Sequence, residues 1–248
     1  MRYSANLNIV LKAIEKATAR LPRDFSELEN LQTNPVSAIK FANACYQRIK
    51  EILIDELTKF RPEYNINFSD GEKIIRSASA EYSFTIFVVD GLSSLVRGIP
   101  DFTVSIAIEH IGANAVKESI SVAISKVIGS ELYYCEKGFG AYLNNRRIRI
   151  SKRGLNDTPL VSLDDNSYFT KEVRESLKLK SYGLRNYGCR TLELAYLSSA
   201  RFDLALFKNW NYEYLKPFML LVREAGGKVV ENEKFILTSN GIIDFSQQ

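Results

Sequence analysis

Residues 82–100 read YSFTIFVVDGLSSLVRGIP, and this stretch decides the fold. Residues 83–89 carry no charge, and five of the seven are large and apolar, which is typical of a buried strand. The strand ends at Asp90 and Gly91, a carboxylate followed by a tight turn. Turns at strand ends are where α/β proteins build their sites. Residues 102–109 largely alternate between apolar and polar side chains, which predicts a second strand with one buried face.

Length and composition favour a soluble, globular, cytoplasmic protein. The chain has 248 residues, enough for one large domain or two small ones, and 46% of them are hydrophobic. No stretch approaches about 18 consecutive apolar residues, and the N-terminus lacks a charged and then apolar signal pattern. We therefore expect no membrane partner.

The charged residues, cysteines and histidine exclude several function classes. The net charge of +4 is modest, and the one basic cluster, residues 144–153, is typical of an exposed strand edge, so no nucleic-acid partner is expected. Cys45, Cys135 and Cys189 are far apart and lack a C-x-x-C spacing, which argues against disulfides or structural zinc. The single histidine, His110, excludes multi-histidine metal sites and is the only candidate base for a Ser-His or Cys-His pair.

The first 154 residues predict two helices that cover a sheet. Apolar residues recur at helical spacing over residues 7–21, and Pro22 is expected to stop this helix. A second helix should begin with Asn34 as its cap and Pro35 at its first position, and extend to Phe60. Asn144 and Asn145 suit a two-residue hairpin turn, because asparagine tolerates positive φ. Strands are expected near residue 66 and over residues 82–89, 102–109, 119–128, 132–135 and 141–150.

After Gly154 the pattern changes to alternating strands and helices. Strands are expected over residues 160–163, 184–188, 202–207, 229–230 and 235–238, with helices over 171–177 and 191–199 and a longer one ending at residue 224. Such alternation is typical of an α/β unit. We therefore expect an N-terminal α+β domain over residues 1–154, with two helices on an antiparallel sheet and the central motif at 83–100, and a C-terminal α/β domain over 155–248.

The central stretch resembles the signature of the inositol monophosphatase family of magnesium-dependent sugar-phosphate phosphatases, D-P-(L/I)-D-G-T-x-N-F-x-x-G-x-P-x-F-x-V-S-I-A. Residues 98–100 (GIP) and 102–107 (FTVSIA) match its second half, and this register places Asp90 and Gly91 on the D-G pair. Residues 138–151 resemble the family's G-x-G-A motif region, residues 187–203 its G-S-x-A-x-x-L-A region and residues 222–227 (VREAGG) its V-x-E-A-G-G. The resemblance implies an α/β (α+β) fold: a five-layered αβαβα sandwich of the inositol monophosphatase and fructose-1,6-bisphosphatase type.

The same resemblance implies where a metal centre would lie. The family hydrolyses phosphate monoesters with water activated by Mg²⁺, an ion that takes about six hard oxygen ligands. Ser69 and Asp70 occupy the two glutamate positions of its G-E-E segment, and Phe87 occupies the first aspartate position of the central motif. The last ligand position, the aspartate of a W-D pair, falls on Tyr214 or Met219, depending on the register.

Some site residues are nevertheless retained. If a metal remains, the resemblance implies that Asp90, Asp70 and the carbonyl of Val89 hold it, with Asp90 and Asp70 as the catalytic residues. Asp90 could instead be a turn and helix-cap residue, and Asp70 a turn residue.

A phosphate would rest on the backbone amides of Gly91 and Leu92, where a helix is expected to begin. Leu92 replaces a threonine of the family, and Lys40 replaces an acid of its D-x-V-T-x-x-D segment. Lys40 and Arg190 are the basic side chains that the alignment directs towards the site. We expect one of them to assist the phosphate or to pair with Asp90 in place of a metal.

Two functions are compatible with this pattern. The first is a pseudoenzyme with a degraded magnesium site and no cofactor, which binds a phosphorylated sugar or polyol or serves as an interaction module. It would be a homodimer or would pair with an active paralogue. The alternative is a Mg²⁺-dependent phosphomonoesterase of the inositol monophosphatase or fructose-1,6-bisphosphatase type with a reduced metal site. The ligand count favours the first, and the sequence leaves open whether the chain is an enzyme.

Overall fold

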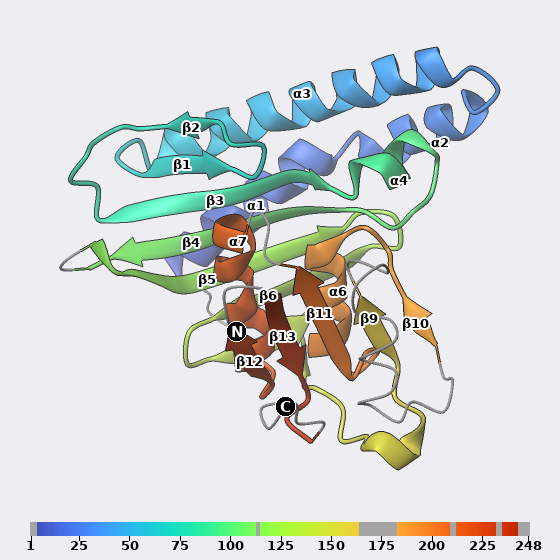
Figure 1. The fold of residues 1–248 in the computed structure, drawn as a ribbon. Coiled ribbons are helices and arrows are strands. Elements are labelled where there is room, and N and C mark those ends of the chain that lie inside the picture. Colours follow the sequence, from blue (N-terminus) through green and yellow to red (C-terminus); the bar gives the residue numbers. More distant parts are fainter. Residues whose placement is uncertain (1–3, 113–114, 164–182, 209–211, 232–234, 243–248) are drawn as a thin grey trace.

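The computed structural model describes residues 4–112, 115–163, 183–208, 212–231 and 235–242. In these residues two sheets alternate with two groups of helices (Figure 1). The arrangement confirms the mixed α/β fold class predicted from the sequence. The predicted helix over 171–177 lies outside the described residues.

Three helices, not two, cover the outer face of the first sheet: α1 (Ala5–Thr18), α2 (Leu21–Asn30) and α3 (Pro35–Phe60). The prediction that Pro22 stops a helix was wrong, because α1 ends at Thr18 and Pro22 lies in the first turn of α2. Proline is tolerated there because the first turn has no intrahelical acceptor for its missing N–H. The predicted cap of α3 is confirmed, since Asn34 Oδ1 accepts a hydrogen bond from the Ser37 amide at 3.1 Å.

The first sheet is built from most of the N-terminal half of the chain. Its strands are Asn65–Phe68 (β1), Lys73–Ile74 (β2), Tyr82–Asp90 (β3), Thr103–Ile111 (β4), Lys117–Lys126 (β5), Glu131–Glu136 (β6), Gly140–Leu143 (β7) and Arg146–Ile148 (β8). Their order is β2-β1-β3-β4-β5-β6-β7-β8. The sheet is mixed, because β1 runs parallel to β3. The prediction of an antiparallel sheet was therefore wrong. The hairpin turn at Asn144 and Asn145 is confirmed, with φ angles of 46° and 66°.

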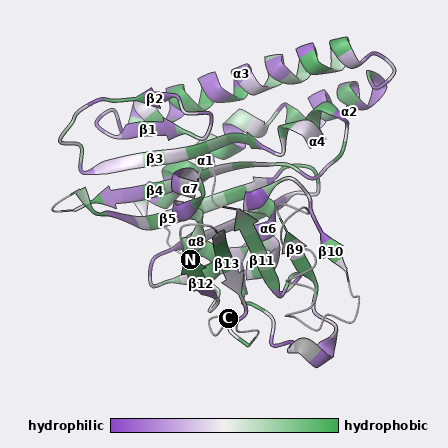
Figure 2. Cartoon of the chain, in the orientation of Figure 1, coloured by the Kyte–Doolittle hydropathy of each residue, from purple (hydrophilic) through white to green (hydrophobic). Residues whose placement is uncertain are grey.

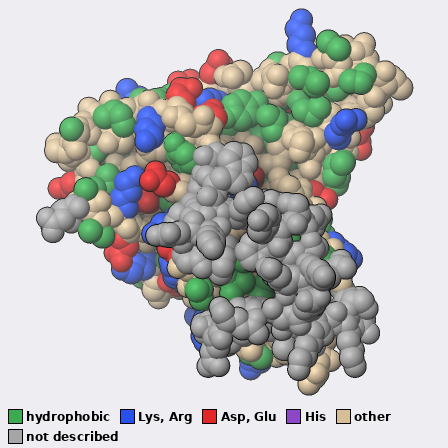
Figure 3. Space-filling model, viewed as in Figure 1, with side chains coloured by type: hydrophobic (Ala, Val, Ile, Leu, Met, Phe, Trp, Pro, Cys, Tyr) green, Lys and Arg blue, Asp and Glu red, His purple; other side chains and the backbone are tan. Residues whose placement is uncertain are grey.

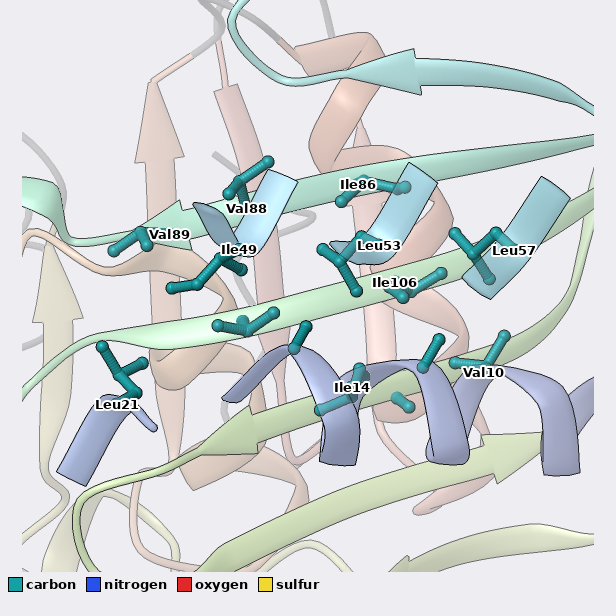
Figure 4. Packing of buried hydrophobic residues seen from close by; sticks show 14 of the residues in the cluster. Val10, Ile14, Leu21, Ile49, Leu53, Leu57, Ile86, Val88, Val89 and Ile106 are labelled. Atoms are coloured by element: carbon teal, nitrogen blue, oxygen red, sulfur yellow. The ribbon is translucent and has the colours of Figure 1, made fainter. Parts of the chain in front are cut away.

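One apolar core lies between this sheet and the three helices. Figure 4 shows Ile49, Leu53 and Leu57 of α3 and Val10 and Ile14 of α1 directed towards β3 and β4. Figure 2 shows hydrophobic and hydrophilic residues alternating along α3, as expected of a helix with one face on a sheet. Phe84, Ile86 and Val88 of β3 belong to this core, whereas the intervening Phe87 belongs to the apolar cluster on the opposite face of the sheet.

The second sheet and the helices between the sheets come from the C-terminal half. Helix α6 (Arg190–Ser198) contacts β4 and β5 on one side and β11 on the other. The predicted long helix is interrupted: α7 (Tyr212–Leu215) and α8 (Met219–Glu224) are separated by a 3-10 turn that contains Pro217. The strands are Val161–Leu163 (β9), Leu184–Arg185 (β10), Leu204–Lys208 (β11), Lys228–Glu231 (β12) and Phe235–Ser239 (β13), in the order β10-β9-β11-β13-β12.

Two carboxylates attach the C-terminal half to the first sheet. Glu224, at the end of α8, accepts hydrogen bonds from the amides of Gly138 and Gly140, both at 2.7 Å. Glu131 on β6 accepts two hydrogen bonds from the guanidinium of Arg201, at 2.6 and 2.8 Å. Among the described residues, no helix is both long enough and apolar enough to cross a membrane.

Candidate functional site

The turn after β3 lies directly against the start of α6. Gly91 has a φ of +82°, and a Cβ atom added to it would lie 2.8 Å from the Asp101 carbonyl oxygen and 3.1 Å from Cys189 Cβ. Only glycine permits this approach without strain. The fold therefore brings together two segments that are about a hundred residues apart, the turn at Asp90 and Gly91 and the turn that leads into α6.

Asp90 is buried and its carboxylate is engaged by the protein itself. Its Oδ2 atom accepts hydrogen bonds from the backbone amide and the hydroxyl of Thr191, both at 2.7 Å. Thr191 is in the first turn of α6, where amides have no intrahelical acceptor, so Asp90 acts as a cap from outside the helix. Burial raises the pKa of Asp90, and the hydrogen bonds from Thr191 and the charge of Arg190 only partly offset that rise.

A buried hydroxyl network supports this contact. Thr191 Oγ1 lies 2.6 Å from Thr103 Oγ1, and Ser105 donates to Thr191 Oγ1 at 3.2 Å. All three side chains are buried. Thr191 replaces the alanine of the family's G-S-x-A motif. Alanine has no hydroxyl, so the side-chain hydrogen bond to Asp90 depends on this replacement. Cys189 Sγ donates to the Asp90 carbonyl oxygen at 3.3 Å.

An aromatic side chain occupies the first aspartate position of the central motif. Phe87 points away from the α1–α3 core and packs edge-on against Phe218, with ring centroids 5.4 Å apart. Met219 is fully buried in the same apolar cluster, and Tyr214 packs against it. Either candidate for the last ligand position therefore contributes to the apolar cluster that contains Phe87.

Asp70 pairs with a cation that was not among the predicted site residues. Lys50 Nζ lies 2.8 Å from Asp70 Oδ2 and 2.7 Å from Glu72 Oε2. The Tyr46 hydroxyl donates to the same Asp70 oxygen at 2.8 Å. Burial alone would raise the pKa of Asp70, but the hydrogen bonds from Lys50, the Glu72 amide and Tyr46 outweigh it and lower the pKa.

The sequence interpretation missed Lys50, although a signal was present. Lys50 follows Tyr46 by four residues and precedes Leu53 by three, so it lies on the face of α3 that packs on the sheet. A lysine on an apolar stripe needs a buried partner. Lys40, which was predicted to face the site, is exposed on α3. Arg190 is half-buried as the first residue of α6.

The remaining predicted residues lie around the same turn. Gly91 caps the short helix α4 (Leu92–Val96), and Leu92 is its first residue. The Val89 side chain is buried in the core beneath α1–α3 (Figure 4). A cavity of about 640 Å³ lies elsewhere, near Glu109, Lys117 and Lys216. None of the predicted site residues lines it, and six residues of β4, or about 20 Å, separate Glu109 from Thr103.

The oxygen donors in this region do not fit a magnesium centre. Mg²⁺ takes about six oxygen ligands in nearly octahedral geometry. The part of the chain that the structure describes contains no group of three or more His, Cys, Asp or Glu side chains placed to hold a metal. One oxygen of Asp90 already accepts two hydrogen bonds, Asp70 is paired with Lys50, and Phe87 offers no ligand atom.

Comparison with known proteins identifies the family. Residues 3–244 match the inositol monophosphatase family. The inositol-1-monophosphatase of Rhizobium meliloti (strain 1021) is 31% identical over 234 residues, which cover 92% of this chain and 85% of that protein. The Nus factor SuhB of Xylella fastidiosa (strain Temecula1) is 30% identical over 239 residues, covering 91% and 81%. The crystal structure of the extragenic suppressor protein suhB from Bartonella henselae has a TM-score of 0.81 at 29% identity, covering 96% of this chain and 95% of that one. The chain therefore belongs to the inositol monophosphatase family.

Proposed function

We propose that this protein is a family member with impaired phosphatase activity, which serves as a binding or interaction module. The observation that carries the proposal is the packing of Phe87 against Phe218 at the first aspartate position of the central motif. Phosphoryl transfer depends on cations that neutralise the charge of the phosphate and of the leaving oxygen. With Ser69 and Phe87 in place of two carboxylates, few groups remain to hold such cations.

The second candidate is a Mg²⁺-dependent phosphomonoesterase of the inositol monophosphatase or fructose-1,6-bisphosphatase type. The comparisons favour it, since relatives 31% identical to this chain are named inositol-1-monophosphatase. Its ligands would be Asp90, Asp70 and the carbonyl of Val89. Relatives named Nus factor SuhB accord better with an interaction module. The geometry around Phe87 is the reason to place the phosphatase second.

We expect no Mg²⁺-dependent hydrolysis of inositol 1-phosphate or fructose 1,6-bisphosphate by the full chain. Release of inorganic phosphate, measured across a magnesium titration, tests this directly. The Rhizobium meliloti inositol-1-monophosphatase, assayed in parallel, verifies that the assay detects turnover. Turnover that rises with Mg²⁺ and disappears in a folded Asp90→Asn variant would support the phosphatase and contradict our proposal.

A weak phosphate site at the start of α4 belongs to the proposed module. Backbone donors do not depend on side-chain identity, and the amides of Gly91 and Leu92 open this helix. An exposed helix end contributes only about 0.3–1 kcal/mol towards a charge, so binding should be weak. Titration with inorganic phosphate at low ionic strength should shift the amide resonances of Gly91 and Leu92. The same titration of Arg190→Gln and Lys40→Gln should show which of the two cations helps to bind phosphate. Amide shifts confined to residues other than Gly91 and Leu92 would rule the site out.

The partners of the module would be a small phosphorylated sugar or polyol and a second protein chain. A homodimer or a pair with an active paralogue is the assembly that we propose, with a domain boundary near Gly154. Figure 3 shows hydrophobic side chains on the surface over α3, where Val36 and Ile39 are 77% and 50% exposed. Exposed apolar residues of this kind are compatible with a protein contact.

A further inference from the structure

Lys50 is a charged residue in a buried position. Its side chain is only 7% exposed, and its ammonium lies 4.4 Å from the centre of the Phe68 ring. A buried ammonium is costly unless it is paired and hydrogen-bonded. Two of its three donors are directed to Asp70 and Glu72, at 2.8 and 2.7 Å. Both carboxylates of this cluster follow β1. Asp70 is at a ligand position of the family's G-E-E segment, and Glu72 comes two residues later.

Asp70 already accepts three hydrogen bonds without an added ion. Its Oδ2 atom accepts from Lys50 and from the Tyr46 hydroxyl, both at 2.8 Å, and its Oδ1 atom accepts from the Glu72 amide at 3.0 Å. A divalent cation at Asp70 would have to displace the ammonium or lie beside it. The second arrangement is unfavourable because like charges repel at such distances.

We infer that Lys50 is a built-in counter-ion that takes the place of a divalent cation at Asp70 and Glu72. This role of Lys50 rests on the proposed function, in which the metal centre has been lost. It is separate from the expectation that Lys40 or Arg190 pairs with Asp90. The two carboxylates then keep their arrangement beside β1 at any magnesium concentration.

Removal of the ammonium should create a divalent-cation site. In Lys50→Gln two carboxylates lose their counter-ion, and in Lys50→Glu a third carboxylate joins them. Isothermal titration calorimetry with Mg²⁺ and with Mn²⁺ should show at least tenfold tighter binding to both variants than to the wild type. The matched control is Lys59→Gln, which makes the same charge change as Lys50→Gln at an exposed position of the same helix and should bind like the wild type.

Thermal unfolding provides a second measurement that does not depend on calorimetry. The wild-type melting temperature should be the same with Mn²⁺ as with a chelator, whereas that of Lys50→Glu should rise when Mn²⁺ is added. A rise in the wild type, or equal affinities for wild type and a folded Lys50→Gln, would overturn the assignment. An equal gain in Lys59→Gln would also overturn it, because the gain would then reflect net charge alone.

The outcome for Lys50 is separable from the outcome for the proposed function. If the wild type shows Mg²⁺-dependent turnover and Lys50→Gln still gains affinity, the proposed function fails and the counter-ion assignment stands. If the wild type is inactive and Lys50→Gln gains nothing, the assignment fails and the proposed function stands.

Discussion

Replacement of Asp203 by alanine is expected to lower the free energy of unfolding by about 3 kcal/mol. Asp203 is fully buried just before β11, and it accepts hydrogen bonds from Arg153 Nε and the Leu160 amide, both at 2.8 Å, and from the Ser151 hydroxyl. Removing one partner of a buried ion pair costs about 3–5 kcal/mol, because the other charge is left uncompensated. The Arg153 side chain is 40% exposed, so solvent limits the loss to the lower end of that range.

The measurement is urea unfolding followed by circular dichroism, with the wild type and two variants for comparison. Asp203→Asn keeps an acceptor for the amide and should lose less stability than Asp203→Ala. Asp55→Ala is the control, since this carboxylate is exposed on α3 and its removal should change stability by no more than about 0.5 kcal/mol. Equal effects of Asp203→Ala and Asp55→Ala would show that Asp203 does not hold residues 151–160 to the C-terminal sheet.

Local signals in the sequence predicted most of the fold. The asparagine cap and proline of α3, the two-residue turn at Asn144 and Asn145, and the uncharged run of β3 each specify an element through neighbouring residues. The errors arose where an element depends on packing. Residues 7–21 have one continuous helical period, yet the chain breaks between α1 and α2. Strand β2 is two residues long and exists only through its pairing with β1.

The site was predictable only in part, for a similar reason. Alignment with family motifs located Asp90, Gly91 and Phe87, because these positions are fixed by one short stretch. The partner of Asp70 was missed because Lys50 is 20 residues away and reaches it only when α3 packs on the sheet. Thr191, which donates hydrogen bonds to Asp90, is 101 residues away from it in the sequence. The only signal of this contact was that Thr191 replaces the alanine of the G-S-x-A motif.

The clearest test at the site itself is Phe87→Asp, which restores the aspartate of the family's motif. We expect it to destabilise the protein by about 3–5 kcal/mol, the range for truncating a buried phenylalanine, because the contact with Phe218 is lost. The new carboxylate would also be placed among apolar side chains, where burial disfavours its charged form. Its pKa would therefore be higher in the folded state than in the unfolded state. The deficit relative to the wild type should be smaller at pH 4 than at pH 8, since the protonated acid is less costly to bury.

Phe87→Leu is the matched control, because it loses the same ring contact but keeps an apolar side chain and should therefore cost less than Phe87→Asp. Urea unfolding of both variants, with and without Mg²⁺, separates packing from metal binding. Asp90 is hydrogen-bonded to Thr191 and Asp70 is paired with Lys50, so one added carboxylate would not have enough other oxygen ligands to bind Mg²⁺. We therefore expect Mg²⁺ to restore no stability to Phe87→Asp. Recovery of the lost stability with Mg²⁺ in Phe87→Asp, but not in Phe87→Leu, would mean that the surrounding oxygens can still assemble around an ion. In that case Phe87 would be the one residue that prevents this chain from binding a metal ion at the site.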